Sequence, residues 1–108
     1  MYAITFDFEI ETLKRTYRNP SYNNAYSDVR KVLTEEYGFS WTQGSVYFGD
    51  ESVDAVVCVM AVQDLKARFN WFEPSVRDIR MLRIDEDNDL GPALGRGGAK
   101  RRARPRAA

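Results

Sequence analysis

The chain has 108 residues, of which 44% are hydrophobic and 13% aromatic, and its 16 Lys and Arg residues balance its 16 Asp and Glu residues. This length supports one domain with a single core, and no apolar run approaches the roughly 20 residues of a membrane-spanning helix. The only cysteine, Cys58, excludes an internal disulfide framework, and with no recognisable signal peptide we expect a cytoplasmic protein.

The balance of charge hides an asymmetry along the chain. All 16 acidic residues lie before residue 90, whereas residues 91–108 hold six bases and no acid. The Gly, Ala, Pro and Arg content of that last stretch cannot bury a core. We therefore predict a folded domain over 1–90 and a basic, disordered tail over 91–108. Such a tail either recruits nucleic acid nonspecifically, with strong salt dependence, or is an inert, solvated extension.

The stretch from Tyr2 to Glu9 is predicted to be the first strand, because its residues alternate in character. One side carries the apolar residues Tyr2, Ile4, Phe6 and Phe8, and the other carries Ala3, Thr5, Asp7 and Glu9. The apolar side is expected to face the core. An acidic pair, Asp7 and Glu9, is left on the opposite side where the strand ends.

Residues 10–20 are compatible with a short helix or an irregular connection that Pro20 ends. A more regular helix follows. Ser21 offers an N-cap oxygen, and Gly38 supplies a C-terminal stop. Between them, apolar residues recur at helical spacing at Tyr22, Ala25, Tyr26, Val29, Val32 and Leu33.

Two short runs, Phe39 to Thr42 and Ser45 to Phe48, predict a hairpin with Gln43 and Gly44 in its tight turn. Ser52 is expected to cap a second helix. Its valine-rich part, 56–62, would also suit a buried strand, but the helical pattern continues through QDLKARF well beyond strand length. We therefore favour a helix up to about Phe69.

Pro74 forbids continuation of that helix, and Val76 to Ile84 is predicted to be the last strand. Its three arginines, Arg77, Arg80 and Arg83, do not share one parity. A bulge would reconcile them.

The order βαββαβ predicts an α+β, ferredoxin-like fold with one four-stranded antiparallel sheet in the order 4-1-3-2 and two helices on one face. The end of the first strand then lies beside the beginnings of the third and fourth. Asp7 and Glu9, Gln43 to Ser45, and Ser75 to Asp78 should therefore meet at one sheet edge. We expect Ser45 and Tyr47 to share the helix-free face with Asp7.

Four segments, YAITFDFE, SYNNAYSDVRKVL, QGSVYFG and VRDIRMLRI, occur in an order and spacing that closely resembles the VapD (virulence-associated protein D) family. The resemblance runs from about residue 2 to residue 90. More distantly, QGSVYFG, a second helix and SVRDIRMLRI are similar to the small CRISPR-adaptation nuclease of the same fold. The family resemblance implies a homodimeric endoribonuclease, in many cases the toxin of a toxin–antitoxin pair with a protein antitoxin.

In the CRISPR-adaptation nuclease, the aspartate that ends the first strand binds a divalent metal and faces its dimer mate, and the matching position here is Asp7. The chain departs from the family at two places. Glu9 stands where many VapD proteins have Asp, and the basic tail lies outside the match.

The absence of histidine leaves two chemical routes to RNA cleavage. Asp7, paired with its dimer mate, would hold a hydrated magnesium or manganese ion that activates water. Alternatively, Asp7 or Glu9 would act as the base while an arginine stabilises the pentavalent phosphate. We favour the metal route.

Besides Asp7, we predict a catalytic role for Ser45, whose hydroxyl can donate to a phosphate oxygen or a metal-bound water. The candidates for RNA binding are Lys14, Gln43, Arg77, Arg80 and Arg83, although each cation has nearby acids to pair with. Glu9 and Asp78 are candidates to support the site.

A different class of function stays open, namely a noncatalytic RNA-binding or protein-interaction homodimer of the same fold. Such a module would stack bases on exposed aromatic rings of its third strand. The segment SVYFG offers only Tyr47 for stacking, and the body of the chain is acidic.

Overall fold

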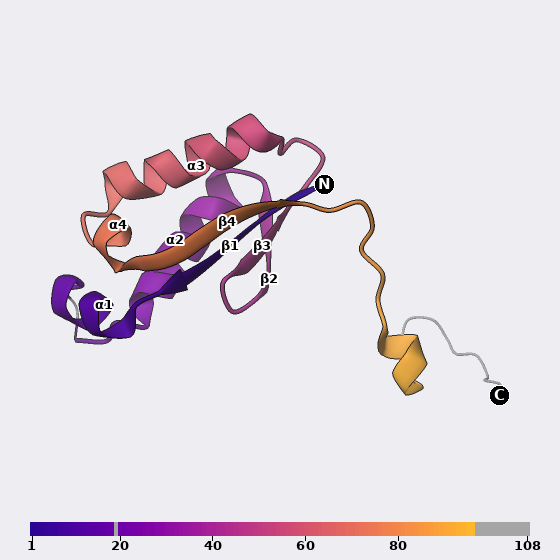
Figure 1. Cartoon of the computed structure of the whole chain (residues 1–108), viewed down its shortest axis with the longest axis horizontal. Coiled ribbons are helices and arrows are strands. Elements are labelled where there is room, and N and C mark those ends of the chain that lie inside the picture. Colours follow the sequence, from indigo (N-terminus) through magenta and orange to yellow (C-terminus); the bar gives the residue numbers. More distant parts are fainter. Residues whose placement is uncertain (19, 97–108) are drawn as a thin grey trace.

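The computed structural model describes residues 1–18 and 20–96. Four strands and five helical segments follow one another along the chain (Figure 1). In order they are β1 (Tyr2–Phe8), α1 (Ile10–Thr16), α2 (Asn24–Glu36), β2 (Phe39–Gln43), β3 (Val46–Gly49), α3 (Ala55–Arg68), α4 (Phe72–Ser75), β4 (Val76–Arg83) and the 3-10 helix η1 (Gly91–Leu94).

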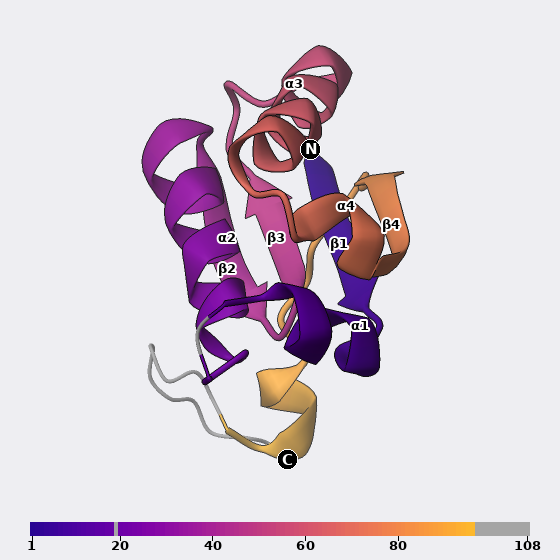
Figure 2. The same cartoon turned by 90° about the vertical axis from the view of Figure 1, so that its left-hand side faces the viewer.

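The strands form one antiparallel sheet in the order β2-β3-β1-β4, which confirms the predicted ferredoxin-like α+β fold. Figure 1 shows α3 running along the upper side of the sheet, and Figure 2 shows α2 beside β2 and β3. The valine-rich segment is therefore a helix, as favoured. Within residues 1–18 and 20–96, no helix covers the opposite face of the sheet.

Aromatic side chains dominate the core beneath these helices. The Phe6 and Phe8 rings of β1 lie 5.0 Å apart, and Phe8 makes edge contacts with Trp71 at 6.1 Å and Phe72 at 5.9 Å. The predicted break at 70–74 is thus a packed corner that includes α4. Pro74 fits there because the first turn of a helix needs no amide donor.

Helix starts depart from the sequence prediction at both long helices. The first of them, α2, begins at Asn24 after the N-cap Asn23, not at Ser21. At α3 the cap is Asp54, whose carboxylate accepts a hydrogen bond from the Val57 amide at 2.9 Å, and not Ser52. The Ser52 amide instead donates to Asp50 at 2.8 Å, because Ser52 belongs to the turn that precedes the helix.

The hairpin turn also lies one residue later than predicted. Gln43 ends β2, opposite Val46, so the two turn residues are Gly44 and Ser45. Gly44 has φ +50°, a left-handed conformation that favours glycine. A bulge between Trp41 and Gln43 accompanies the turn.

This shift reverses the expected facing of β3. Tyr47 lies opposite Ile4 and is fully buried on the helix side, whereas Val46 lies opposite Thr5 and Phe48 opposite Ala3. The expectation that Ser45 and Tyr47 share the helix-free face is therefore wrong for Tyr47. A change of one residue in register moves every side chain of a strand to the other face.

The predicted bulge in β4 is confirmed at Arg77. Asp7 pairs with Asp78, but Phe8 pairs with Val76, so Arg77 is the extra residue. Beyond the bulge Asp78 and Arg80 share the helix-free face with Asp7 and Thr5.

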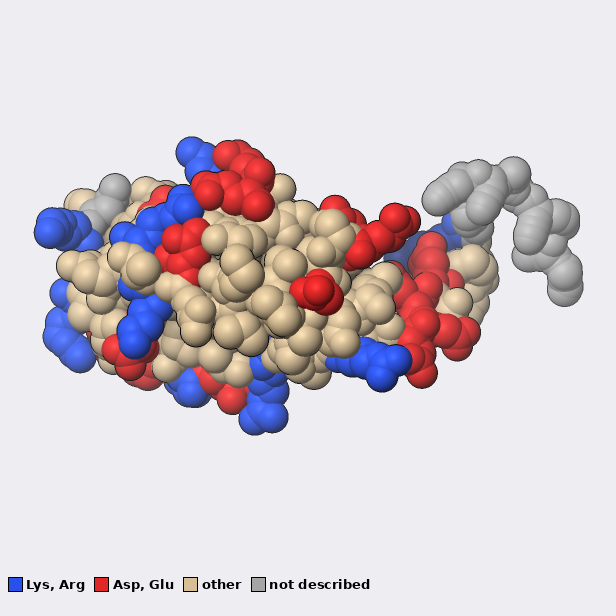
Figure 3. Space-filling model, turned by 90° about the horizontal axis from the view of Figure 1, so that it is seen from above, with Lys and Arg blue, Asp and Glu red and all other residues tan. Residues whose placement is uncertain are grey.

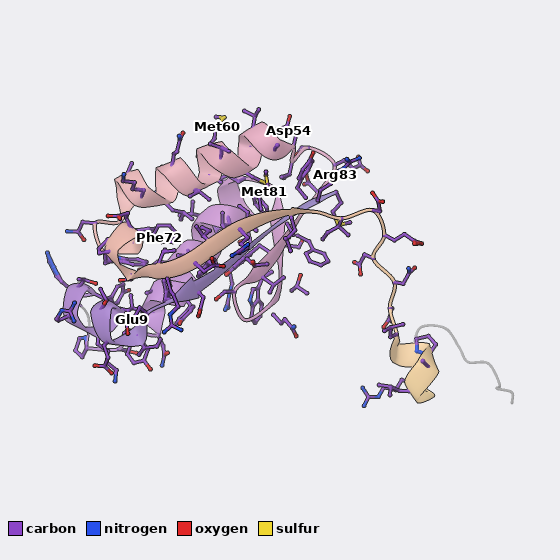
Figure 4. The ribbon with its side chains drawn as sticks, viewed as in Figure 1. Glu9, Asp54, Met60, Phe72, Met81 and Arg83 are labelled. Carbon is purple, nitrogen blue, oxygen red and sulfur yellow. The ribbon has the colours of Figure 1, made fainter. Side chains whose placement is uncertain are left out.

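Figure 3, which views the molecule from above, shows uncharged surface between charged side chains. Among the exposed large apolar residues are Val56, Val59 and Met60 of α3. Below it, Met81 of β4 (Figure 4) lines a groove of about 200 Å³ together with Ile4, Cys58, Val62 and Ile79. No helix in the described part of the chain is long and apolar enough to cross a membrane.

Past Ile84 the described chain leaves the sheet and forms η1 (Figure 1). The predicted tail begins at residue 91, and its first residues, Gly91–Leu94, form this 3-10 turn. Residues 97–108 of the predicted tail lie outside the described residues.

Candidate active site

Three segments meet where β1 ends, as the topology predicted. The Phe6 amide donates to the Ser45 carbonyl at 3.2 Å, and the Glu9 amide donates to the Ser75 carbonyl at 2.7 Å. Between these two bonds, Asp7 lies directly opposite Asp78. The backbone ladder therefore fixes the positions of Asp7, the β2–β3 turn and the start of β4 relative to one another.

Two carboxylates and two guanidinium groups gather at this edge. An Nη1 atom of Arg77 lies 3.7 Å from Asp7 Oδ2, and Arg80 Nε donates to Asp78 Oδ2 at 2.9 Å. The four side chains are 49% to 67% exposed. We call these residues, Asp7, Arg77, Asp78 and Arg80, the acid–arginine cluster.

Repulsion and attraction act together in the cluster. Like charges directly opposite one another on neighbouring strands repel, and each carboxylate of the pair has one arginine beside it. The pKa of Arg80 is raised by its hydrogen bond to Asp78. Because the bulge makes Arg77 an extra residue, its guanidinium can reach Asp7 from the neighbouring strand.

Ser45 stands next to this cluster in the turn. Its carbonyl is used by the Phe6 amide, and no hydrogen bond of its hydroxyl is recorded among the residues that the structure describes. The side chain is half-buried. The register sets Ser45 opposite Phe6, whose side chain faces the core, so the predicted place of Ser45 on the face of Asp7 is not confirmed.

Gln43 extends the helix-free face away from the cluster. The pairs Gln43–Val46, Val46–Thr5 and Thr5–Arg80 form one row across all four strands. Gln43 is exposed at the outer edge of this row. It therefore lies on the same face as Asp7 but two strands away.

Glu9, predicted to support the site, has another task. Its Oε1 atom accepts hydrogen bonds from the Thr12 amide at 2.8 Å and from the Thr12 hydroxyl at 2.6 Å, which caps α1. These bonds lower the pKa of Glu9, so it is a weaker base than an ordinary glutamate. The acidic pair predicted on one strand face is wrong, because β1 ends at Phe8.

Two of the predicted RNA-binding cations lie apart from the cluster. Arg83 pairs with Tyr2 at the beginning of β1, and Figure 4 places Glu9 and Arg83 at opposite ends of the sheet. Lys14 lies on α1, where its Nζ is 4.0 Å from Glu11 and 5.4 Å from the centre of the Tyr22 ring. Arg77 and Arg80 are the predicted cations that the fold brings to Asp7.

Tyr26 of α2 is a neighbour of the site that the sequence did not reveal. Its ring packs 5.1 Å from Phe8, and its pKa is raised by burial, by Tyr22 and by the charge of Asp7. The spacing of Tyr26 along α2 matches that of core residues, so periodicity alone could not separate it from them.

The fit of the predicted divalent metal depends on the carboxylates at this edge. Within 1–18 and 20–96, no group of three or more His, Cys, Asp or Glu residues is arranged to hold a metal ion. Asp7 and Asp78 offer two carboxylates on adjacent strands. Two carboxylates with waters and a substrate phosphate satisfy magnesium, which is seldom held by an all-protein cage.

No protein-family model matches the chain. Individual proteins do. The chain is 48% identical over 94 residues, 87% of its length, to Endoribonuclease VapD 2 of Riemerella anatipestifer, covering 99% of that protein. It is 50% identical over 94 residues to an Endoribonuclease VapD homolog of Helicobacter pylori, covering 96% of it. Endoribonuclease VapD of Haemophilus influenzae is 37% identical over 90 residues, with 93% of its length covered.

Proposed function

The chain belongs to the VapD family, and on this premise we propose that it is an endoribonuclease whose cleavage site is the acid–arginine cluster at the end of β1. The relatives named endoribonucleases align with nearly their whole length, which supports RNA cleavage. The observation that carries the location is the pairing of Asp7 with Asp78, each with an arginine beside it, on the exposed sheet edge.

The charges of the cluster suit phosphodiester chemistry. The Arg77 and Arg80 guanidinium groups would bind the scissile phosphate and stabilise the charge that grows on it in the transition state. Asp7, which is 62% exposed, would take the proton from the attacking hydroxyl or water. When RNA binds, its phosphate would compete with the carboxylates for the arginines, which frees Asp7 from Arg77.

A divalent cation is the second element of the proposal. Asp7 and Asp78 would hold a magnesium or manganese ion, which would supply an activated water molecule and neutralise phosphate charge. Two further residues would assist catalysis. Ser45 would orient the phosphate through its hydroxyl, and Arg80 would hold Asp78 in place through the 2.9 Å hydrogen bond.

We further propose that the protein acts as a homodimer and as the toxin of a toxin–antitoxin pair. Support for self-association comes from β4, an edge strand with unpaired backbone groups, next to the exposed apolar residues Val59 and Met60 of α3. The antitoxin rests on the family resemblance alone. Sedimentation of the purified protein tests the dimer, and co-expression with the products of neighbouring genes tests the antitoxin.

Cleavage of a labelled RNA by the wild type and by Asp7→Asn tests the active site. Reactions are run with magnesium, with manganese and with a chelator. We expect a loss of about 10²- to 10⁴-fold in the variant, as is usual when a positioned acid–base group is removed. The matched control is Glu51→Gln, an exposed carboxylate beyond the far end of β3 that should leave the rate unchanged.

Each outcome has a distinct meaning. Metal-dependent cleavage that Asp7→Asn abolishes supports the metal route, and chelator-resistant cleavage supports side-chain acid–base chemistry. Undiminished cleavage in a folded Asp7→Asn protein would refute the assigned site. Tight RNA binding by a folded wild type that never cleaves would favour the noncatalytic binding module.

A further inference from the structure

Arg30 of α2 stacks on Trp41 of β2, the outer strand of the sheet. The Cζ atom of Arg30, on α2, lies 3.7 Å from the centre of the Trp41 ring on β2. The indole Nε1 of Trp41 donates to the Gly44 carbonyl at 2.9 Å. The ring is thus fixed at its edge and on one face, yet 45% of the residue stays exposed.

Arg30 differs from Arg68 of α3 in its hydrogen-bond partners. Arg68 donates to both Glu36 carboxylate oxygens at 2.8 and 2.9 Å and also to Asp64. Arg30 has no carboxylate partner among the described residues, and its Nε is buried without an acceptor. The Tyr47 hydroxyl is also buried. Burial raises the pKa of Tyr47, and its interaction with the nearby Arg30 guanidinium lowers it.

Such a surplus of donors is costly unless an acceptor is supplied. A buried polar group without a partner is unfavourable, so each one calls for an explanation. Here the donors lie under an exposed indole ring, and no carboxylate of the described residues pairs with the Arg30 charge. An anion that carries a flat ring matches both features, and a nucleotide is such an anion.

We propose that Trp41 and Arg30 form a nucleotide subsite for single-stranded RNA, with a base stacked on the open face of Trp41 and the adjoining phosphate bound by the Arg30 guanidinium. Aromatic rings stack unpaired bases of any sequence, and arginine binds phosphate through paired donors. This assignment rests on the proposed endoribonuclease function, because it extends the RNA path away from the cleavage site.

The turn connects this subsite to the acid–arginine cluster. The Trp41 indole is hydrogen-bonded to Gly44, which precedes Ser45. The Ser45 carbonyl accepts a hydrogen bond from the amide of Phe6, the neighbour of Asp7. Strands β2 and β1 are separated only by β3, which places them about 10 Å apart. Trp41 lies on the helix side of the sheet, opposite Tyr47 and against Arg30 of α2, whereas Asp7 lies on the helix-free side. An RNA strand would therefore reach both sites by passing around the turn from one face to the other.

Binding of a labelled, 2′-O-methylated oligouridine, which cannot be cleaved through its 2′ position, tests the subsite. We expect Trp41→Ala to weaken binding by about 10-fold or more and Trp41→Phe to weaken it less, because phenylalanine keeps a smaller stacking surface. Arg30→Gln should weaken binding and lower the salt slope by about one. The matched control is Lys31→Gln, which removes an equal charge from the next, exposed position of α2.

The wild type supplies a readout that does not depend on how the variants fold. The chain has two tryptophans, and Trp71 is only 7% exposed. Base stacking should therefore quench the fluorescence of Trp41, and the quenching should disappear in Trp41→Phe. On cleavable RNA, Trp41→Ala should raise KM while kcat at saturation stays near the wild-type value.

Two results would overturn the subsite. One is wild-type fluorescence that RNA leaves unchanged. The other is that Trp41→Phe and Arg30→Gln, each folded, bind RNA no more weakly than Lys31→Gln does. The stacked pair would then only stabilise the edge strand. Failure of the proposed nuclease function would give a different result. The protein would then bind RNA through Trp41 and Arg30 but would not cleave it.

Discussion

Asp7 and Asp78 face each other directly across the β1–β4 pair, two exposed carboxylates held side by side by the backbone ladder. Like charges in such a pair are unfavourable by up to about 1 kcal/mol, and Arg77 and Arg80 lie beside the two carboxylates and oppose this repulsion. The arrangement therefore concentrates negative charge at one edge of the sheet, and repulsion within the pair lowers the free energy of unfolding.

This repulsion predicts how the two carboxylates affect stability. Asp7→Asn and Asp78→Asn should each leave the free energy of unfolding unchanged or raise it by at most about 0.5 kcal/mol, since exposed charges are screened by solvent. Urea unfolding at low and high salt measures the effect, which should shrink as salt rises. A loss of more than about 1 kcal/mol in either variant would show that the pair is structural.

Ser45→Ala is expected to slow RNA cleavage by about 10-fold or more without a change in melting temperature. A hydrogen bond to a charged group is worth about 1.5–3 kcal/mol, and the fold uses the carbonyl of Ser45 rather than its side chain. Initial rates at saturating RNA measure the change. Ser40→Ala, an exposed serine of β2 paired with Phe48, is the control. Equal rates for the two variants would show that the Ser45 hydroxyl takes no part in catalysis.

The cap at Glu9 predicts a pH-dependent contribution to stability. The Thr12 hydrogen bonds lower the pKa of Glu9 below its ordinary value of 4.5, so the carboxylate stabilises the fold above about pH 4.5 and the contribution is lost as pH falls through the lowered pKa. Glu9→Gln should melt at a lower temperature than the wild type at pH 7. The difference should narrow in acid; a constant difference from pH 7 to pH 3 would contradict the cap. Glu11→Gln is the matched control.

Tyr47→Phe removes a buried hydroxyl that has no partner in the described part of the chain. Because an unsatisfied buried group is unfavourable, this substitution should leave the free energy of unfolding unchanged or raise it by about 1 kcal/mol. Chemical denaturation compares it with Tyr37→Phe. The Tyr37 hydroxyl donates to Asp64 at 2.7 Å, so its loss should destabilise. A Tyr47→Phe protein less stable than Tyr37→Phe would indicate that a bound water or ligand uses the Tyr47 hydroxyl.

The sequence predicted the strand order and the meeting of Asp7 with the turn and the start of β4, because hydrophobic periodicity and antiparallel pairing determine both. It also predicted the bulge, since the spacing of Arg77 and Arg80 breaks the alternation. Local patterns were sufficient for these features.

The facing of β3 could not be predicted in the same way. Val46, Tyr47 and Phe48 are all apolar, so alternation in this strand does not say which side is buried. The turn position decides it, and Gly44 allows a turn that starts at either Gln43 or Gly44. The stack of Arg30 on Trp41 depends in turn on how α2 lies over β2, which is a tertiary relationship with no signature in either segment.

The closure of the sheet also sets when the protein can act during its own synthesis. The Ile84 amide donates to the Met1 carbonyl at 2.7 Å, and these residues stand 83 positions apart. Asp7 is among the first residues made, but Asp78 reaches it only after β4 has left the ribosome and paired with β1. A partly synthesised chain therefore carries one half of the acid–arginine cluster. If that cluster is the cleavage site proposed above, the chain would spare its own message until the domain is complete.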